Sequence, residues 1–591
     1  MLRMPAAVLI LAAVALPVAA GPPESVKAAE AKRVATIARV RPAVVAVCFY
    51  GGEACGSGVL IDPAGYALTN YHVVEPTGPV LQCGLPDGKL YDAVLVGQDR
   101  VGDVALVKLL PREPGKPFPF VKLADSDGVK VGDWSMAMGN PFGLSLDFTP
   151  TVTYGLVSGV NRYQPPEGKG TLEYTDCVQT DSSINPGNSG GPLFDMTGDL
   201  IGINGRGSFE KRGRVNSGVG YAISINQIKN FLGHLHAGLD ADHAALGATV
   251  ETANEDGDLS KMVVRQILPD ADAARRGVEP GDQLVSFAGR PLTSANQYKN
   301  VLGIYPKGWR LPLSYRRGAD TKDVLVRLAG VLEAAPEPTA DDKPRPKPKG
   351  LPKRAGVDRS PAKKLYEAKA GFANYYFNRQ MQDQLRAATR AACDFAPQAG
   401  AWTMAGTIEL ADRRGDVKVT WADAADGLAE VKLTRNGIED AVRPLKSGVP
   451  AGELQLPQGS GGMLATLYQY RRLLVQWDAG FEGGFDHAGY EPVYLPPAAD
   501  KPAGKARDRR VECEVVRTRH GPFEAKWYFD LGTHKLIACE STVSPEDDPC
   551  ELYFADYWPV EGRELPYTIT ARVGDKTYAT IRVTAYQLGK K

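Results

Sequence analysis

The stretch TDSSINPGNSGGPL, residues 180–193, decides how this chain is interpreted. Within it, Ser189 has Gly187 two residues before it and Gly190 and Gly191 directly after it. Glycine adopts backbone angles that other residues avoid and leaves amide N–H groups accessible. A serine hydroxyl beside such N–H groups is the layout of an acyl-transfer nucleophile with an oxyanion hole. The alternative is an ordinary turn, because Gly and Ser are common in turns.

Two upstream residues are candidate partners of Ser189. His72 lies in YALTNYHVV, residues 66–74, where an apolar strand runs into a turn. Asp103 precedes the apolar run VALVKL, so its carboxylate is placed at a strand end, where it can hold an imidazole in one tautomer. Taken alone, His72 is better explained as a core histidine with satisfied hydrogen bonds. Asp99 is the rival of Asp103, although its Gln-Asp-Arg setting is typical of a turn cap.

The order His, Asp, Ser along the chain is that of chymotrypsin-like double β-barrels, and differs from that of subtilisins and α/β-hydrolases. Five segments in family order resemble the HtrA/DegP family of trypsin-like proteases, over roughly residues 30 to 232. These segments are TNYHVV (69–74), DVAL (103–106), MGNPFGL with TVTYGLVSG (138–144 and 151–159), TDSSINPGNSGGPL (180–193) and GVGYAI (218–223). The resemblance implies a serine endopeptidase domain, which we place at residues 28–235.

The resemblance assigns a role to each member of the predicted triad. Ser189 would attack the scissile carbonyl, His72 would take its proton, and Asp103 would orient His72. The predicted oxyanion hole comprises Gly187, Asn188 and Ser189, with the N–H groups of Gly187 and Ser189 as donors. In this family the peptide before the serine can be flipped in the resting enzyme, so Gly187–Asn188 is a candidate hinge.

The predicted specificity pocket lacks a charged residue. Ser183 occupies the position six residues before the nucleophile, where an acid would select Lys or Arg. The other predicted pocket residues are Ile184, Gly220, Tyr221 and Ala222. These walls predict a preference for small aliphatic residues at the cleaved position, as the resemblance also implies.

The start of the chain predicts export. A short positive region, MLRM, precedes an apolar stretch at residues 6–18 that is too short to span a bilayer comfortably. Val18-Ala19-Ala20 then offers a small-residue cleavage site. Residues 1–20 are therefore predicted to be a signal peptide, which places the protein in the periplasm or outside the cell. The alternative is an uncleaved N-terminal anchor.

Cysteine usage and charge exclude some classes of site. Eight cysteines in 591 residues do not make a disulfide-dense scaffold, but export allows a few bridges. Cys48 with Cys55, and Cys539 with Cys550, flank turns and are candidate cross-strand pairs. No CxxC occurs and no spacing fits zinc, so we predict neither a metal site nor a cofactor. The 69 basic and 69 acidic residues balance, which argues against nucleic acid as a partner.

Residues 240–332 are predicted to form a separate β-rich unit. The segment PGDQLVSF, residues 280–287, is the strongest part of a resemblance to PDZ domains. Such domains bind an extended peptide by strand addition and capture its terminal carboxylate on backbone N–H groups. Here the binding loop would be Ala245, Leu246, Gly247 and Ala248, although Ala248 is smaller than the apolar residue usual at that position. The alternative is a PDZ fold that only docks on the protease.

The rest of the chain divides into a linker and a third unit. Residues 333–358 are rich in Pro, Lys and Ala and predict an extended spacer. In residues 359–591, a helix is predicted at 365–393, followed by antiparallel strands with a hairpin turn at 530–536. This pattern weakly resembles LolA-type lipoprotein carriers, which hold acyl chains in an apolar concavity. The alternative is that the apolar helix and aromatic strands are simply a core.

The predicted fold class is therefore mainly β: a chymotrypsin-like double β-barrel, a PDZ domain, and a C-terminal domain of helix and antiparallel sheet. The predicted function is an exported endopeptidase for unfolded or misfolded polypeptides, regulated by C-terminal peptides. The resemblance to the HtrA/DegP family also implies assembly as a homotrimer or a multiple of it. Two other functions stay open. One is a chaperone or scaffold, which an intact triad argues against. The other is a lipid or lipoprotein binder that acts through the C-terminal unit.

Overall fold

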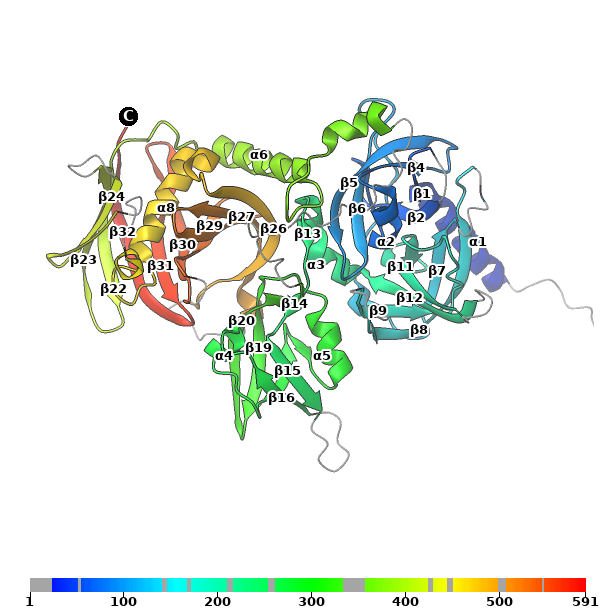
Figure 1. Cartoon of the computed structure of the whole chain (residues 1–591), viewed down its shortest axis with the longest axis horizontal. Helices are drawn as coiled ribbons and strands as arrows, with labels where there is room; N and C mark the ends of the chain where they lie inside the picture. Colours follow the sequence, from blue (N-terminus) through cyan, green and yellow to red (C-terminus); the bar gives the residue numbers. More distant parts are fainter. Residues whose placement is uncertain are drawn as a thin grey trace, which may run out of the picture.

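The computed structural model describes residues 24–51, 55–140, 145, 147–166, 172–209, 216–252, 261–332, 357–423, 429–443, 450–497, 506–544 and 547–590. The predicted signal peptide lies outside these residues, as does the predicted linker except for its last two residues. In the described part, the chain forms two barrels, a smaller β unit and a large curved sheet (Figure 1).

The first barrel is built from valine-rich and leucine-rich segments, and β-branched residues such as valine favour extended backbone. Its six strands form a closed antiparallel ring, because β5 pairs with both β4 and β6. Val59, Leu68 and Leu106 are completely buried inside it. The strands are β1 (Val44–Cys48), β2 (Cys55–Leu60), β3 (Tyr66–Thr69), β4 (Val80–Gly84), β5 (Leu90–Asp99) and β6 (Val104–Leu109). Helix α1 (Glu24–Val40) precedes the barrel, and α2 (Tyr71–Val74) follows β3.

The second barrel is also closed and has six strands. They are β7 (Trp134–Gly139), β8 (Thr151–Gln164), β9 (Tyr174–Thr180), β10 (Pro192–Phe194), β11 (Leu200–Phe209) and β12 (Asn216–Ser224). Helix α3 (Ile225–His236) follows, capped by the Ser224 side chain, which accepts from the N–H of Gln227. Strand β13 (Asp240–Ala241) then returns to the first barrel and pairs in parallel with β5. The predicted double barrel is confirmed.

The smaller β unit, called the PDZ-like unit below, has its own core, which includes Met262, Leu284 and Leu311. Its main sheet has the order β15-β16-β17-β19-β20, which fits the predicted PDZ fold. The strands are β14 (Ala244–Ala245), β15 (Ala248–Thr252), β16 (Met262–Ile267), β17 (Gln283–Phe287), β18 (Arg290–Pro291), β19 (Arg310–Arg317), β20 (Asp320–Arg327) and β21 (Ala329–Gly330). The helices are α4 (Asp272–Arg275) and α5 (Ala295–Leu302).

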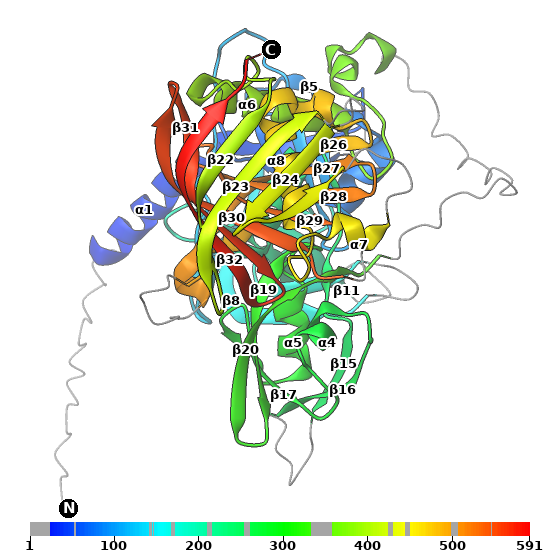
Figure 2. The same cartoon turned by 90° about the vertical axis from the view of Figure 1, so that its left-hand side faces the viewer.

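The C-terminal unit is one antiparallel sheet of eleven strands that curls around helix α8 (Figures 1 and 2). Leu464, Leu467 and Leu473 of α8 are completely buried against sheet residues that include Trp402 and Trp527. In spatial order the strands are β25 (Ile438–Val442), β24 (Ala429–Arg435), β23 (Arg414–Asp423), β22 (Trp402–Leu410), β32 (Lys576–Leu588), β31 (Arg563–Val573), β30 (Cys550–Val560), β29 (Leu536–Thr542), β28 (Phe523–Asp530), β27 (Arg510–His520) and β26 (Gly484–Tyr494). The helices are α6 (Tyr375–Ala392), α7 (Ala451–Leu454) and α8 (Met463–Gln476). Short 3₁₀ turns are η1 (Arg41–Ala43), η2 (Glu75–Thr77), η3 (Ser126–Gly128), η5 (Val357–Arg359), η6 (Pro361–Leu365), η7 (Trp477–Gly480) and η8 (Ala506–Arg509).

One detail of this unit differs from the sequence prediction, and another agrees with it. The helix expected from residue 365 begins only at Tyr375, because the Asn374 side chain caps it by accepting from the N–H of Tyr376. The predicted hairpin at 530–536 is present between β28 and β29.

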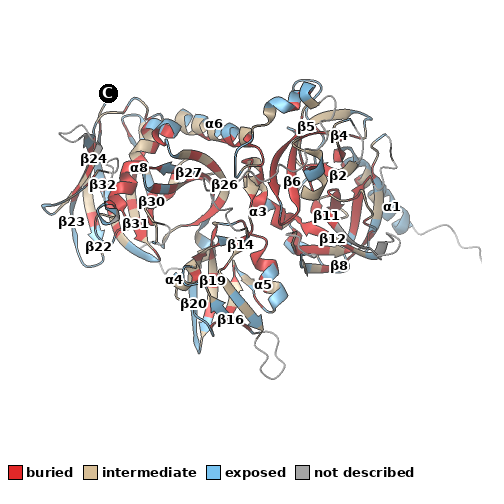
Figure 3. Ribbon diagram, in the orientation of Figure 1, coloured by how far each residue is buried: buried red, intermediate tan, exposed pale blue. Residues whose placement is uncertain are grey.

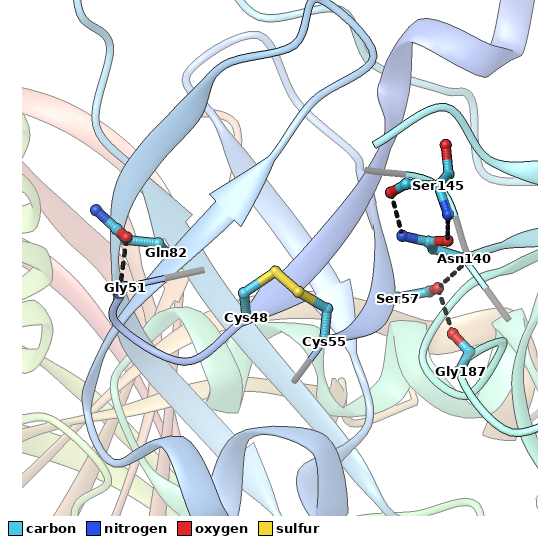
Figure 4. Close-up of a disulfide and its surroundings, with 8 residues drawn as sticks. All are labelled: Cys48, Gly51, Cys55, Ser57, Gln82, Asn140, Ser145 and Gly187. Atoms are coloured by element: carbon cyan, nitrogen blue, oxygen red, sulfur yellow. Dashed lines mark hydrogen bonds between the residues drawn. A yellow bond between two sulfur atoms is a disulfide. The ribbon is translucent and has the colours of Figure 1, made fainter. Parts of the chain in front are cut away.

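One of the two candidate disulfides is formed. Cys48 and Cys55 face each other across β1 and β2 and are bridged (Figure 4). The Cys539–Cys550 pairing was wrong: both thiols are free and buried. The ladder places Cys539 opposite Leu552 and Cys550 opposite Ser541, so the register separates the two sulfur atoms.

The three units pack around α3, which Figure 3 shows as mostly buried or half-buried. Gly233 of α3 lies so close to β26 that an added Cβ would stand 2.4 Å from the Tyr490 ring. The PDZ-like unit meets the C-terminal sheet through ion pairs. Arg310 pairs with Glu551 at 2.5 Å, and the two side chains are only 9% and 2% exposed.

This buried pair generates a stability prediction. Replacing Arg310 by Met leaves the Glu551 carboxylate buried without its cation, which costs about 3–5 kcal/mol. Arg265→Met is the matched control, because the Arg265–Glu251 pair is exposed and is worth about 0–1 kcal/mol. We expect calorimetry to show a clearly larger fall in Tm for Arg310→Met. Equal falls in the two variants would contradict this account of the junction.

Candidate active site

His72 and Asp103 form a close pair. His72 lies in α2, immediately after strand β3 ends, and its Nδ1 is 2.8 Å from Asp103 Oδ2. The backbone N–H of His72 also donates to Asp103 Oδ1, at 3.0 Å. An ionised carboxylate can only accept hydrogen bonds, so Nδ1 carries the proton and Nε2 is left as the basic nitrogen.

The Asp103 carboxylate is completely buried and held from several sides. Tyr174, the first residue of β9, donates its hydroxyl to Asp103 Oδ2. The Asn70 side-chain amide donates to the Asp103 carbonyl at 2.9 Å. Asp103 also has a φ of 58°, a strained backbone for a residue other than glycine, which persists only where surrounding contacts enforce it.

The rival Asp99 caps its turn, as its sequence setting indicated. Its Oδ1 accepts from the N–H groups of Val101 and Gly102, at 3.1 and 2.8 Å. Asp103, rather than Asp99, is therefore the carboxylate that contacts His72.

Asp103 sets the protonation of His72. Burial lowers the pKa of His72, but the hydrogen bond and the charge of Asp103 outweigh it, with a further contribution from Glu75. The net result is a pKa above the ordinary value of 6.5.

The Ser189 loop packs against the residues that lead to His72. Gly190 has a φ of 83°, which favours glycine, and an added Cβ there would lie 2.2 Å from the Ser57 carbonyl oxygen and 2.3 Å from Thr69 Oγ1. Ser189 Oγ donates to the Gly205 carbonyl at 3.3 Å. Within the described residues no hydrogen bond joins Ser189 to His72, so the hydroxyl must turn from Gly205 to reach the imidazole.

The Gly187–Asn188 peptide is held on both sides. Its carbonyl accepts from Ser57 Oγ at 2.6 Å, and Ser57 Oγ in turn accepts from the N–H of Asn140 at 2.9 Å (Figure 4). Its N–H, which belongs to Asn188, donates to the Asn185 carbonyl at 2.9 Å. The N–H groups of Gly187 and Ser189 have no acceptor among the described residues.

The sequence did not indicate the supporting roles of three of these residues. Ser57 lies in an ordinary strand, Asn70 is one residue of the TNYHVV segment with no role assigned to it, and Tyr174 was indicated only as part of an apolar strand. A buried tyrosine does need a partner for its hydroxyl, but the sequence does not name that partner.

The predicted pocket residues are only partly brought together. The Ile184 side chain is buried against Gly220, where an added Cβ would stand 2.6 Å from Ile184 Cδ1. Ser183 is exposed, and its carbonyl accepts from the Asn188 side chain at 3.2 Å. Tyr221 is half-buried on β12. Ala222 is a correction, because its side chain packs in the core of the second barrel rather than in a pocket.

The predicted peptide-binding loop is ordered by the core of its own unit. Ala245 pairs with Ala329 in the short β14–β21 ladder. Leu246 is 3% exposed and packs inward, so it anchors the loop rather than lining a groove. Gly247 has a φ of 73°, and Ala248 begins the edge strand β15.

In the described part of the chain, no cluster of three His, Cys, Asp or Glu side chains is arranged to hold a metal ion. Among the described helices, none combines the length and the apolar character needed to cross a membrane.

Comparisons with known proteins match part of this chain. The family described as a trypsin-like peptidase domain matches residues 56–203. The periplasmic serine endoprotease DegP of Escherichia coli (strain K12) is 37% identical over 285 residues, which cover 46% of this chain and 56% of DegP. A probable periplasmic DegP-like serine endoprotease of Pseudomonas fluorescens is 34% identical over 288 residues, which cover 48% of this chain and 57% of that protein. This chain thus spans a little over half the length of these relatives.

A solved structure of the HtrA-type protease AlgW with a tripeptide is also similar. It is 30% identical, with a TM-score of 0.41, and the match covers 51% of this chain and 98% of that one. The residues matched by the family model extend from β2 to β11 and include His72, Asp103 and Ser189. Residues 56–203 therefore match a trypsin-like peptidase domain, and about half of the chain is similar to DegP-type serine endoproteases.

Proposed function

We propose that this protein is an exported serine endopeptidase that cleaves unfolded or misfolded polypeptides in the cell envelope. The observation that carries the proposal is the His72–Asp103 pair, with Nδ1 and Oδ2 2.8 Å apart. The loop that carries Ser189 packs beside it, against Ser57 and Thr69, and only a glycine at position 190 leaves room for this contact. The periplasmic relatives support the compartment, which an N-terminal signal peptide at residues 1–20 would provide.

The proposed mechanism uses these residues in sequence. The Ser189 hydroxyl turns from the Gly205 carbonyl to His72 Nε2, loses its proton to it and attacks the scissile carbonyl. Asp103 stabilises the imidazolium that forms, and His72 returns the proton to the leaving amine. In the second half of the reaction, His72 takes a proton from a water molecule, which attacks the acyl-enzyme, and His72 then returns the proton to Ser189 Oγ as the product acid leaves.

We assign the oxyanion hole to the N–H groups of Gly187 and Ser189. The N–H of Asn188 is engaged by Asn185 and is not a donor to substrate. Asn188 instead supports the loop, since its side chain donates to the Ser183 carbonyl at 3.2 Å. For the pocket, the apolar contact of Ile184 with Gly220 supports a preference for small aliphatic side chains.

For partners, we propose unfolded polypeptides at the active site and C-terminal peptides at the PDZ-like unit. In the described sheet β15 pairs only with β16, so its other edge is open to an added strand. We further propose a homotrimer assembled through the protease domains, which light scattering of the purified protein tests directly. A lipid role for the C-terminal unit has less support, because side chains of α8 already occupy the concave face of its sheet.

Removal of the Ser189 hydroxyl tests its role as the nucleophile. Ser189→Ala removes the attacking oxygen, and we expect hydrolysis of casein to fall by a factor of about a million and fluorophosphonate labelling to stop. Ser158→Ala, an exposed serine on β8, is the control and keeps wild-type activity. A wild-type protein as inert as Ser189→Ala, even with heat and added peptides, would refute the proposed protease function.

The protonation of His72 makes the activity depend on pH. His72 must be neutral to accept a proton, and Asp103 raises its pKa, so kcat/KM falls as the pH drops through a value above 6.5. Asp103→Asn removes the charge and the correct tautomer, lowering kcat about 10⁴-fold and moving this acid limb to lower pH. Peptide hydrolysis between pH 5 and 9 measures both effects. An acid limb centred below 6.5 in the wild-type protein would contradict the assigned role of Asp103.

Removal of the Ser57 hydroxyl tests whether its hydrogen bond to the Gly187 carbonyl supports the oxyanion hole. Ser57→Ala releases the Gly187 carbonyl, so the preceding loop can turn and disorder the proposed oxyanion hole. We expect kcat to fall up to about 100-fold with little change in KM, because the hole binds the transition state. Wild-type kcat in this variant would mean that the peptide is held by its other contacts alone.

A further inference from the structure

A second His–Asp pair lies behind the catalytic one. His243 Nε2 is 2.8 Å from Asp99 Oδ2, and both side chains are 1% exposed. Asp99 ends β5 and stands four residues before Asp103, whereas His243 lies in the segment between β13 and β14, where the chain enters the PDZ-like unit. The two partners are 144 residues apart in sequence.

Asp99 shapes the loop that delivers Asp103. Its Oδ1 accepts from the N–H groups of Val101 and Gly102, while its Oδ2 faces His243. Gly102 packs directly on the pair, since an added Cβ would be 2.4 Å from Asp99 Oδ2 and 2.8 Å from His243 Nε2. The loop ends at Asp103 with its strained φ of 58°, a conformation that depends on the contacts around it.

The PDZ-like unit holds His243 in turn. The His243 carbonyl accepts from the N–H of Val331 at 3.0 Å, and the neighbouring Ala244 donates to the Tyr305 carbonyl at 3.0 Å. The His243 ring stacks on Phe231 of α3 with a centroid separation of 4.5 Å. A displacement of the PDZ-like unit would therefore move the imidazole that orients the Asp99 carboxylate.

We propose that His243 is a positioning residue for the catalytic centre: through Asp99 it fixes the loop at residues 99–103 and thereby the Asp103 carboxylate against His72. This inference rests on the proposed protease function. If His243 has this role, the position of the PDZ-like unit relative to the two barrels affects the rate of catalysis. The alternative is an ion pair that only stabilises the docking of the two units.

The test compares His243→Gln with Asp99→Asn in the full-length protein. Asn at position 99 keeps an oxygen for the N–H groups of Val101 and Gly102. It replaces the oxygen that faces His243 by an amide NH2 group, so His243 loses both the charge and the acceptor opposite its Nε2. The probe is a fluorophosphonate, whose labelling rate at Ser189 is measured from pH 5 to 9 together with peptide hydrolysis. His236→Gln is the matched control, because this half-buried histidine packs edge-on against Tyr66, away from the loop.

We expect both variants to lose about 10- to 100-fold in kcat/KM with little change in KM, as small misplacements of catalytic groups do. The acid limb should also move to lower pH, because Asp103 would no longer sit close enough to raise the pKa of His72. The double variant should be no worse than the more impaired single variant, since His243 acts through Asp99. His236→Gln should keep the wild-type rate and pH profile.

Two results would overturn the inference while leaving the protease function intact. One is a wild-type labelling rate and pH profile in folded His243→Gln and Asp99→Asn. The other is a loss of rate that follows the loss of folded protein, with an unmoved acid limb in the folded fraction, because that is the signature of a stabilising pair. If His243→Gln does not fold, Asp99→Asn decides alone. Absence of labelling in the wild-type protein would instead refute the protease function itself.

Discussion

The catalytic region depends on one buried carboxylate, that of Asp103. A charge taken out of water costs several kcal/mol unless hydrogen bonds and opposite charge compensate it. Here the compensation comes from both barrels: His72 belongs to the first, and Tyr174 begins β9 of the second. The carboxylate is satisfied only when the barrels are docked, so the same contacts that hold the barrels together also orient the imidazole.

The loop that carries Ser189 also depends on contacts between the two barrels. It connects β9 to β10 in the second barrel, yet its backbone is fixed by Ser57 from β2 of the first. Gly190 is needed because the Ser57 carbonyl and the Thr69 side chain leave no room for a Cβ. Each barrel therefore positions the functional groups of the other, and neither could build the site alone.

The PDZ-like unit and the C-terminal sheet extend this dependence outward. Helix α3 leaves the second barrel and is covered by β26 of the C-terminal sheet, while the segment after it carries His243 to the catalytic loop. Charged side chains such as Arg310 and Glu551 join the two later units. Because these ion pairs are buried and polar, they require a particular geometry. They therefore fix how the PDZ-like unit and the C-terminal sheet pack against each other.

Local chemistry made much of this readable from the sequence. Glycines around Ser189, a histidine at a strand end and an aspartate before an apolar strand each have a short-range signature, and their order along the chain indicated the double barrel. Apolar runs likewise marked several strands, and turn residues marked the hairpin at 530–536. Contacts between distant segments left no such mark. The pairing of His243 with Asp99, the hydroxyl of Tyr174 on Asp103, the support from Ser57 and the separation of Cys539 from Cys550 all depend on strand register and on which surfaces dock. Those are set by packing across the whole molecule, and so only the tertiary structure decided them.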